Sequence, residues 1–415
     1  MVERPFRYGG GELCCEGVAL ADIAERYGTP TYIYSAGAIR SAYAALDAAF
    51  AALPHRVCYS VKANPNLAVC SLLAGLGAGA DVTSGGELAR ALRAGFQPSS
   101  IVLAGVGKSR EEMQQALAAG IGLFSVESEG ELRLLSEVAQ TMRLRAPVAL
   151  RVNPDVDPRT HPYITTGLAR NKFGVPLSDA RYLYDLAGQL PGISISGVGM
   201  HIGSQIEDLI PMIEATRSLA ALARDLLGAG HPLRYLDIGG GFAIPYGEEM
   251  PDPPVRLARE IEPLVRSLGL TLLTEPGRSL VGGAGALLLR VLYRKRNGAR
   301  KFIIADGGMN ALLRPSLYGA RHKLLPVREG AGETEADVVG PVCESADFLS
   351  RDVPVPDVQP DELLAVLDAG AYGFAMSSEY NGRPRPAEVL IDRGVARLVR
   401  RRQTYDEMMA LELGL

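Results

Sequence analysis

The sequence contains few of the residues that metal sites and disulfide frameworks need. Five cysteines and 5 histidines occur in the chain, with no C-x-x-C pair and no two histidines spaced like metal ligands. An odd number of cysteines also fits a disulfide framework poorly. We therefore expect free thiols, a reducing cytoplasmic location and no bound metal.

Runs of charged or apolar residues are also missing. The formal net charge is −4 and the basic residues are dispersed, which predicts no nucleic-acid partner. The longest apolar run, Leu280 to Leu289, is too short and too rich in glycine to span a bilayer. The start, MVERPFRYGG, lacks the pattern of a secretory signal. These features predict a soluble cytoplasmic protein that binds no membrane.

The middle of the chain alternates between strand-like and helix-like segments. Eight predicted strands, each but the last followed by a helix, suit a (β/α)8 TIM-like barrel over residues 35–275. An open doubly wound sheet is the alternative, because alternation alone does not reveal closure. Ser109 and Glu112 form a capping box for one helix. The strands are expected at 56–62, 79–83, 101–104, 122–126, 148–152, 197–202, 234–238 and 271–275, and the clearest helices at 87–94, 110–119, 127–140, 209–227 and 255–268.

The chain changes character after residue 275. Short β-like runs separated by Gly, Pro and Asn, among them 286–293, 301–305 and 337–343, predict an antiparallel β-barrel or sandwich domain. The extended N-terminal segment 1–34 is expected to join it, which gives a second domain of residues 1–34 and 276–415. A last helix is expected at 405–413.

Lys62 is the first candidate for chemistry. It follows the apolar run Val57–Val61, so we expect it to close a buried strand. Desolvation at such a position lowers the pKa of a lysine, and a neutral amine can form a Schiff base with an aldehyde. The alternative is a lysine that extends from the strand end into water.

Polar and glycine-rich segments recur where the barrel strands are expected to end. The active site of such a barrel lies at the carboxyl ends of its strands, so these segments are expected to meet. They are Thr83–Gly86, Arg151–Asn153, Met200–Gln205, Asp237–Gly241 and Thr274–Arg278.

Within these segments, Gly239–Gly241 could let backbone amides approach a phosphate, with Ser204 adding a hydroxyl. Alone, three glycines more often form a flexible turn. His201 could stack on a planar ring, or be an ordinary core histidine. Glu275 could contact a ring nitrogen, or pair with Arg278. Together with a lysine that forms a Schiff base, these groups describe a pocket for pyridoxal 5'-phosphate.

At this point the sequence resembles a known family, the barrel-type pyridoxal-phosphate decarboxylases, and within it the branch that acts on meso-2,6-diaminopimelate. The resemblance covers almost the whole chain and rests on ordered motifs. They are YSVKAN around Lys62, DVTSGGEL at 81–88, HPYITTGLARNKFG at 161–174, HIGSQI at 201–206, DIGGGF at 237–242, EPGRSLV at 275–281, DGGMN at 306–310, RPSLYGA at 314–320, GPVCESADFL at 340–349 and GAYGFAMSSEYNGRPRPAEVL at 370–390.

The resemblance implies a set of cofactor contacts. A lysine would form the Schiff base, a histidine would stack on the ring and a glutamate would pair with the ring nitrogen, while hydroxyl and backbone groups would hold the phosphate. The residues are Lys62, His201, Glu275, Ser204, Gly240, Pro276, Gly277, Arg278 and Tyr372.

The resemblance also implies how the substrate is bound. Its distal carboxylate would be held by the side chains of Arg278, Arg314, Tyr318 and Tyr372. Arginines grip a carboxylate through two parallel hydrogen bonds, which agrees with this assignment. Glu344 would contact the distal amino group, and Cys343 would return a proton to the reacting carbon, although a cysteine in a strand is more often a buried apolar thiol. In the family, Cys343 and Glu344 reach the partner's site, which implies a homodimer.

The predicted activity is therefore decarboxylation of meso-2,6-diaminopimelate to L-lysine and CO2, the last step of lysine biosynthesis. The main alternative is a decarboxylase of ornithine or arginine on the same fold, although those substrates lack the distal carboxylate that Arg314 and Tyr318 would bind. An amino-acid racemase, a cofactor-free Schiff-base aldolase and an inactive regulatory homologue remain as further alternatives.

Overall fold

The computed structural model describes residues 4–158, 161, 166, 171–246 and 250–413. Most of the motif quoted at 161–174 lies outside these residues. The chain forms two compact units, which we describe separately. The barrel unit comprises Tyr43–Ile244 and Met250–Ser279, and the β unit comprises Met1–Ala42, Pro245–Glu249 and Leu280–Leu415.

The barrel unit contains a closed ring of eight parallel strands, which confirms the predicted barrel. Closure is visible in the pairing of the last strand with the first, Leu272 with His55. The open-sheet alternative is therefore wrong. The strands are β5 (His55–Ser60), β6 (Gly79–Val82), β7 (Ile101–Leu103), β8 (Leu123–Val126), β9 (Ala146–Asn153), β11 (Ile193–Gly199), β12 (Tyr235–Asp237) and β13 (Thr271–Thr274). A short strand, β10 (Val175–Pro176), pairs with β9.

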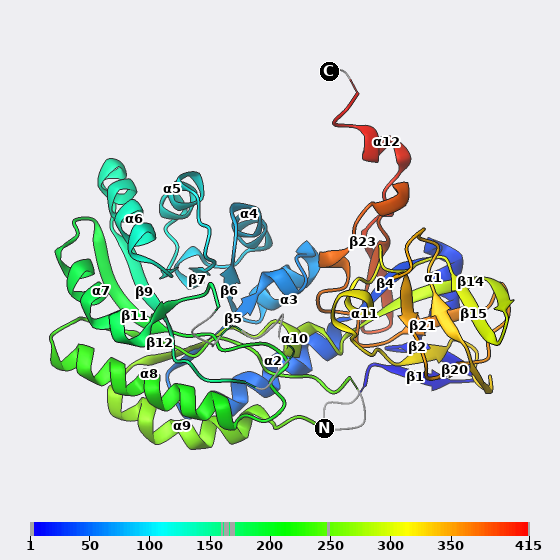
Figure 1. Ribbon diagram of the computed structural model, residues 1–415, viewed down its shortest axis with the longest axis horizontal. Coiled ribbons are helices and arrows are strands. Elements are labelled where there is room, and N and C mark those ends of the chain that lie inside the picture. The colour runs from blue at the N-terminus through cyan, green and yellow to red at the C-terminus, as the bar shows by residue number, and fades with distance from the viewer. Residues whose placement is uncertain (1–3, 159–160, 162–165, 167–170, 247–249, 414–415) are drawn as a thin grey trace. The chain divides into compact units, whose positions relative to one another are not determined.

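Helices surround these strands (Figure 1). The predicted capping box is confirmed: Ser109 Oγ accepts from the N–H of Glu112 at 3.2 Å, and Glu112 Oε2 accepts from the N–H of Ser109 at 2.9 Å. A helix follows each barrel strand before the last, as predicted, including the helix between β10 and β11. The helices are α2 (Ala36–Phe50), α3 (Leu67–Gly75), α4 (Gly85–Ala94), α5 (Arg110–Ala119), α6 (Glu129–Met142), α7 (Leu177–Gln189), α8 (Ile210–Gly228) and α9 (Pro254–Leu268).

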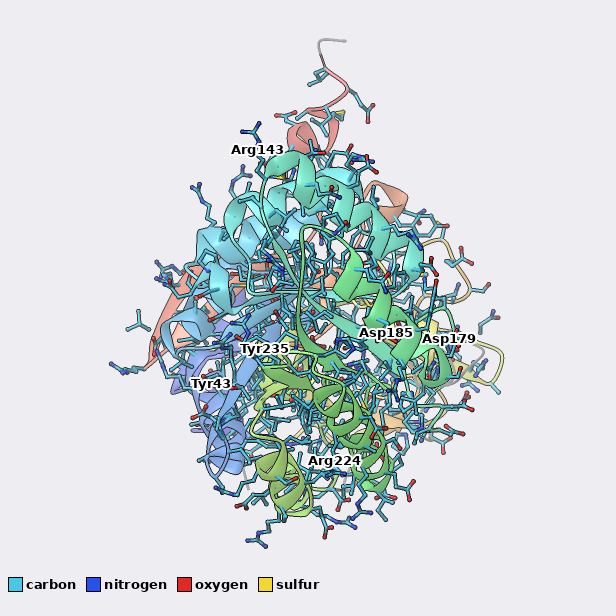
Figure 2. The ribbon with its side chains drawn as sticks, turned by 90° about the vertical axis from the view of Figure 1, so that its left-hand side faces the viewer. Tyr43, Arg143, Asp179, Asp185, Arg224 and Tyr235 are labelled. Carbon is cyan, nitrogen blue, oxygen red and sulfur yellow. The ribbon has the colours of Figure 1, made fainter. Side chains whose placement is uncertain are left out.

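An apolar cluster lies inside the barrel unit, and exposed polar side chains lie on its outer helices. Cys58, Val102, Leu123, Ala149 and Leu273 form a buried cluster from five different strands, against which Tyr235 packs. Figure 2 shows this unit with its side chains, including Asp179 and Asp185 on α7 and Arg224 on α8 at its outside. Side chains alternate along each strand, so that one set points into the barrel and the other faces the surrounding helices.

Two predicted strand ends are wrong by a few residues. β5 ends at Ser60, and Lys62 lies in a short 3-10 helix, η1 (Val61–Ala63), rather than in the strand. The reason is a turn that closes when the N–H of Asn64 donates to the carbonyl of Val61 at 3.1 Å. Likewise β11 ends at Gly199, before the predicted end at Ile202.

The β unit is built on a mixed sheet that runs in the order β19-β18-β15-β14-β4-β22-β23. Its central strand β14 pairs antiparallel with β4, with Leu287 opposite Tyr32. The N-terminal segment therefore joins this sheet, as predicted. The strands are β4 (Thr31–Ser35), β14 (Gly285–Asn297), β15 (Arg300–Ala305), β18 (Asp337–Val339), β19 (Phe348–Ser350), β22 (Ala387–Asp392) and β23 (Val395–Arg400).

Smaller elements complete the β unit. β18 ends at Val339, so the strand predicted at 337–343 stops before Cys343, and α12 is shorter than the helix predicted at 405–413. The further strands are β1 (Phe6–Gly9), β2 (Glu12–Cys15), β3 (Val18–Ala19), β16 (Leu324–Pro326), β17 (Glu333–Glu335), β20 (Pro354–Pro356) and β21 (Leu363–Val366). The helices are α1 (Leu20–Tyr27), α10 (Arg278–Val281), α11 (Arg314–Tyr318) and α12 (Tyr405–Met409).

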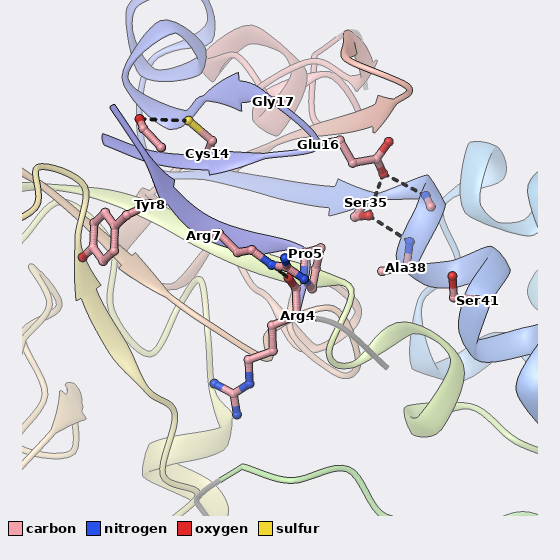
Figure 3. A pocket seen from close by; sticks show the side chains of 12 residues that line it. Arg4, Pro5, Arg7, Tyr8, Cys14, Glu16, Gly17, Ser35, Ala38 and Ser41 are labelled. Atoms are coloured by element: carbon pink, nitrogen blue, oxygen red, sulfur yellow. Dashed lines mark hydrogen bonds between the residues drawn. The ribbon is translucent and has the colours of Figure 1, made fainter. Parts of the chain in front are cut away.

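A cavity of about 820 Å³ lies among the N-terminal residues of the β unit (Figure 3). Its carboxylate, Glu16, accepts from Ser35 Oγ at 2.6 Å and from the N–H of Gly37 at 2.8 Å. Ser35 Oγ in turn accepts from the N–H of Ala38 at 2.9 Å. These bonds satisfy the first amides of α2, so Glu16 serves to anchor that helix.

Candidate active site

The sequence-predicted residues fall into two groups, one in each compact unit. Both groups lie outside regular strands, at the positions that follow them. In the barrel unit they are Lys62, His201, Ser204, Gly240, Glu275, Pro276, Gly277 and Arg278, after β5, β11, β12 and β13. In the β unit they are Arg314, Tyr318, Cys343, Glu344 and Tyr372.

Lys62 contacts a buried aspartate that the sequence prediction did not include among the site residues. Its Nζ lies 3.5 Å from Asp81 Oδ2, which also accepts from Ser60 Oγ at 2.6 Å. The side chain of Lys62 is 41% exposed and that of Asp81 only 1%. Lys62 is therefore only partly desolvated, and its amine lies beside a buried carboxylate. A charged residue inside a strand, as Asp81 is in β6, is an available sequence signal for such a role.

Asp237 and Glu275 form a hydrogen-bonded carboxyl pair at the ends of β12 and β13. Burial raises the pKa of Asp237 to about 7, against the hydrogen bond from the N–H of Gly239. Burial first, and then the charges of Asp237 and Asp81, raise the pKa of Glu275 well above its usual range. The pair therefore retains a proton near neutral pH, because two adjacent buried carboxylates cannot both ionise at low cost.

His201 is an uncharged ring in this site. Burial, and then the charges of Arg151 and Lys62, lower the pKa of His201 well below its usual value. Its Nδ1 accepts from the N–H of Gly240 at 3.2 Å, which places the ring proton on Nε2. Its carbonyl accepts from Thr166 Oγ1 at 2.8 Å and Arg151 Nη2 at 3.4 Å. A neutral flat ring held in this way can stack on a planar cofactor.

Arg151 belongs to a buried ion pair that the sequence prediction did not assign. Its Nη1 lies 3.1 Å from Glu127 Oε1, and both side chains are largely buried. Glu127 Oε2 also accepts from the N–H of Gly174 at 2.9 Å. The pair links the ends of β8 and β9 to the backbone of His201. Sequence position gives Arg151 and Glu127 the same strand-end signal as the predicted residues.

The glycines of 239–241 are required by close packing. A Cβ on Gly240 would lie 2.1 Å from the carbonyl oxygen of Glu275, and one on Gly241 would lie 2.4 Å from that of Gly203. The amides of Gly239 and Gly240 donate to Asp237 and His201, respectively. In this structure the loop therefore brings strand ends together, and these two amides have protein acceptors.

Arg278 and Ser204 are in contact beside this loop. Arg278, which is buried, donates from Nη2 to Ser204 Oγ at 3.0 Å. The alternative pairing of Arg278 with Glu275 is not needed, because Glu275 bonds to Asp237. A hydroxyl and a guanidinium in contact, next to a backbone without side chains, fit a phosphate group.

Two further observations indicate that the barrel residues fit a polar cofactor. Asp81 Oδ1 and Thr274 Oγ1 are buried and have no hydrogen-bond partner among the described residues. Buried polar atoms are nearly always bonded in native proteins, so these atoms have capacity for a bound group. Lys62, the neutral His201 and the protonated pair are the groups that pyridoxal 5'-phosphate would need.

Arg314 in the β unit is buried and contacts His322 and Tyr246. Its Nη1 donates to His322 Nε2 at 2.9 Å, and its guanidinium lies 4.6 Å from the ring centre of Tyr246. His322 Nδ1 donates to the carbonyl of Leu367 at 2.8 Å, so its ring is neutral. These contacts orient the guanidinium of Arg314. Tyr318 lies on the same helix, α11.

Cys343 and Glu344 are exposed in the loop between β18 and β19. The N–H of Cys343 donates to Asn381 Oδ1 at 2.7 Å, and Tyr380 Oη donates to Glu344 Oε2 at 3.1 Å. The alternative of a buried apolar thiol for Cys343 is wrong. Tyr372 is partly exposed and has a positive φ of 57°, a conformation that is rare outside glycine.

Comparison with known proteins first defines the class. Residues 36–282 match the family model of the pyridoxal binding domain of pyridoxal-dependent decarboxylases. This range contains the whole barrel and every predicted cofactor residue except Tyr372. The class is therefore a barrel enzyme that uses pyridoxal phosphate.

Curated relatives then give the particular family. The chain is 48% identical to a diaminopimelate decarboxylase of Pseudomonas aeruginosa, with 98% of both chains covered. It is 46% identical to one of Aquifex aeolicus, covering 99% of this chain and 98% of the other. The chain belongs to the diaminopimelate decarboxylase family.

Solved structures agree with this assignment. The diaminopimelate decarboxylase of Helicobacter pylori in complex with L-lysine has a TM-score of 0.92 and 40% identity, over 95% of this chain and 99% of that one. Among the described residues of this chain, every helix is too short or too polar to cross a membrane.

Proposed function

We propose that this chain catalyses the pyridoxal-phosphate-dependent decarboxylation of meso-2,6-diaminopimelate to L-lysine and CO2, the last step of lysine biosynthesis. The observation that carries the proposal is the set of groups at the ends of β5, β11, β12 and β13. They combine an amine on Lys62, a neutral ring on His201 and a proton shared by Asp237 and Glu275. Similarity to diaminopimelate decarboxylases over nearly the whole chain supports the choice of substrate.

In this proposal the barrel domain, residues 35–275, holds the cofactor. Lys62 would bind it covalently through Nζ, and His201 would stack on the ring. Glu275 would share its proton with the ring nitrogen, held in place by Asp237. The phosphate would lie against Ser204 Oγ, Arg278 and the backbone of Gly240 and Gly277, lined by Pro276 and reached by Tyr372. When bound, the cofactor supplies an electron sink for the electron pair released with CO2.

The second domain, residues 1–34 and 276–415, would select the substrate and complete the reaction. Arg314, with Arg278, Tyr318 and Tyr372, would bind the distal carboxylate, because a guanidinium binds a carboxylate through two parallel hydrogen bonds and Arg314 is buried. Glu344 would bind the distal ammonium. Cys343 Sγ would deliver the proton that replaces the lost carboxylate.

We also propose a homodimer in which Cys343 and Glu344 enter the site of the partner subunit. Their exposure on the β unit supports this arrangement. We place the enzyme in the cytoplasm, where a reducing environment would keep the five free thiols reduced.

Replacement of Lys62 tests the cofactor assignment. Lys62→Ala should remove the visible absorption of the bound cofactor and lower kcat by about 10³-fold or more, because no amine remains to hold the aldehyde. Absorbance spectra of the purified proteins measure this. Lys295→Ala, at an exposed lysine of β14 with no proposed role, should keep the spectrum. A visible band that persists in Lys62→Ala would rule out the assignment.

A substrate panel separates the proposal from its alternative, an ornithine- or arginine-type decarboxylase. We expect kcat/KM for diaminopimelate to exceed that for ornithine or arginine by about 10³-fold or more, since these lack the anion that Arg314 would bind. CO2 release measures both. Arg314→Gln should lower kcat/KM for diaminopimelate and leave that for ornithine nearly unchanged. Faster release from ornithine by the parent enzyme would favour the alternative.

A further inference from the structure

The loop 340–347, which carries Cys343 and Glu344, has no regular secondary structure. Both side chains are exposed, and exposed loops usually fluctuate more than the strands that they connect. A proton donor, however, needs a fixed distance and direction to the carbon that it protonates. Some other part of the chain must therefore restrain the middle of this loop.

Asp347 restrains the base of the loop. Its Oδ2 accepts from the N–H of Val342, and its Oδ1 accepts from the N–H of Met309, both at 2.6 Å. Gly308 and Gly340 pack so closely on this carboxylate that a Cβ on either would lie within 2.5 Å of Oδ1. These contacts hold the loop where it leaves β18, and the N–H of Asp347 donates to the carbonyl of Glu344 at 3.0 Å, but none of these bonds reaches Cys343 or the carboxylate of Glu344.

The segment 380–383 restrains the middle of the loop. Asn381 Oδ1 accepts from the N–H of Cys343 at 2.7 Å, and Tyr380 Oη donates to Glu344 Oε2 at 3.1 Å. A third bond runs from Arg383 Nη2 to the carbonyl of Pro341 at 3.1 Å. The two residues with proposed roles are thus each bonded to a neighbouring residue of one short segment.

Asparagine suits position 381 for two reasons. Its backbone has φ 59° and ψ 27°, in the left-handed region that asparagine tolerates better than most residues. Its side chain also supplies the acceptor oxygen for Cys343. Gly382, which follows, has φ 64°. The turn therefore points the amide of Asn381 at the backbone of Cys343.

We propose that Asn381 is a positioning residue that fixes the backbone of Cys343 so that the thiol delivers its proton from a defined place. Tyr380 does the same for the carboxylate of Glu344. The role rests on the proposed function, because it acts through the proton that Cys343 returns. This proposal gives a role to the segment EYNGR at 379–383, for which the sequence alone indicated none.

The test compares two substitutions to glycine, each at a residue whose backbone has a positive φ. Asn381→Gly keeps the backbone conformation and removes only the acceptor oxygen. We expect kcat to fall by about 3- to 10-fold, the effect of one lost hydrogen bond, with KM changed by less than about twofold. The solvent deuterium isotope effect on kcat should rise, because proton return becomes slower. Asp361→Gly, at φ 72° in a separate turn, should change none of these values.

A double-mutant cycle shows whether Asn381 acts through Cys343. In a Cys343→Ala background, Asn381→Gly should have no further effect on kcat. An unchanged kcat in the single variant, or equal losses in both backgrounds, would overturn the proposal. Equal thermal stability of Asn381→Gly and Asp361→Gly is expected and would exclude a general loss of folding.

A measurement without substrate separates this proposal from the proposed function. In a Cys14→Ser background the remaining cysteines other than Cys343 are buried, so iodoacetamide reports on Cys343. Asn381→Gly should raise its alkylation rate by about threefold or more, because the loop is released. An unchanged rate would overturn the restraint even if decarboxylation is confirmed. A raised rate in a protein that does not decarboxylate diaminopimelate would contradict only the proposed function.

Discussion

At the scale of single residues, burial determines the protonation states of the titratable side chains in the site. Asp237 and Glu275 retain a proton near neutral pH, and His201 lacks one. The protonated pair does not follow from the residue types, whose usual pKa values predict two charged carboxylates, whereas burial only strengthens the neutral state that histidine already favours at neutral pH. Both pKa shifts follow from burial and from the charges of the neighbouring groups.

The carboxyl pair should make the stability of the cofactor-free enzyme depend on pH. Burial raises the pKa of Asp237 from 3.8 to about 7. The stabilisation that this raised pKa gives the folded protein is complete below about pH 4 and is lost as the pH rises through 7. Between pH 5.5 and 8 this loss amounts to about 2 kcal/mol. Asp237→Asn keeps an acceptor for Gly239 and gives Glu275 a permanent donor.

We therefore expect the Tm of Asp237→Asn to exceed that of the parent by more at pH 8 than at pH 5.5, measured by thermal denaturation without cofactor. The exposed Asp225 on α8 provides the control, and Asp225→Asn should shift Tm equally at both pH values. A gap for Asp237→Asn that is independent of pH would mean that Asp237 is ionised at neutral pH.

At the scale of elements, the loops that follow the barrel strands determine which side chains meet. The loop after β12 packs against the end of β13, since the N–H of Glu275 donates to the carbonyl of Gly239 at 2.8 Å. The contact at Gly240 leaves no room for a side chain. The three glycines therefore bring Glu275 and His201 to a common place, in addition to any contact with phosphate.

Gly240→Ala should disturb this arrangement. Its Cβ would lie 2.1 Å from the carbonyl oxygen of Glu275 and 2.8 Å from its carbonyl carbon, so the backbone must shift. We expect a loss of about 1–3 kcal/mol in stability, and about tenfold weaker binding of the cofactor. Chemical denaturation and cofactor titration measure these two effects.

Gly228→Ala is the matched control, because a Cβ at this last residue of α8 meets nothing within 4 Å. Alanine favours a helix over glycine, so this variant should be as stable as the parent or slightly more stable. If Gly240→Ala behaves in the same way, the close packing of the loop is unimportant for the site.

At the scale of the whole molecule, the proposed roles are divided between two compact units. The barrel unit carries the residues assigned to the cofactor, apart from Tyr372, and the β unit carries those assigned to the proton donor and to most of the substrate contacts. In the proposed homodimer, the barrel unit of one chain and residues from the β unit of the other chain would form one site.

Mixed dimers test this arrangement. Lys62→Ala and Cys343→Ala chains, co-expressed with different tags, each lack a different part of the site. If Cys343 enters the partner's site, dimers that carry both tags should recover about half of the parent activity, since one of the two sites in each mixed dimer is intact. CO2 release after purification through both tags measures it.

Two differently tagged Lys62→Ala chains serve as the control and should remain inactive. Mixed dimers that form, as shown by both tags, but have no more activity than the separate variants would place Cys343 and Lys62 of the same chain in one site.

The sequence alone determined the barrel, the β domain and the candidate residues. These depend on patterns that are local in the chain: alternation of strands and helices, polar residues after strands, and motifs such as those around Lys62 and Arg314. The capping box of Ser109 was also predicted correctly. Short-range physics decides such features, so they can be read without coordinates.

Only the tertiary structure decided the partners of those residues. The contact of Lys62 with Asp81, the pair of Asp237 and Glu275, and the bond from Cys343 to Asn381 join positions that are between 19 and 38 residues apart. Such contacts depend on the register of the barrel strands and on turns with positive φ, which side-chain periodicity does not specify. Burial, and with it the protonation of Asp237 and His201, follows from that arrangement in space.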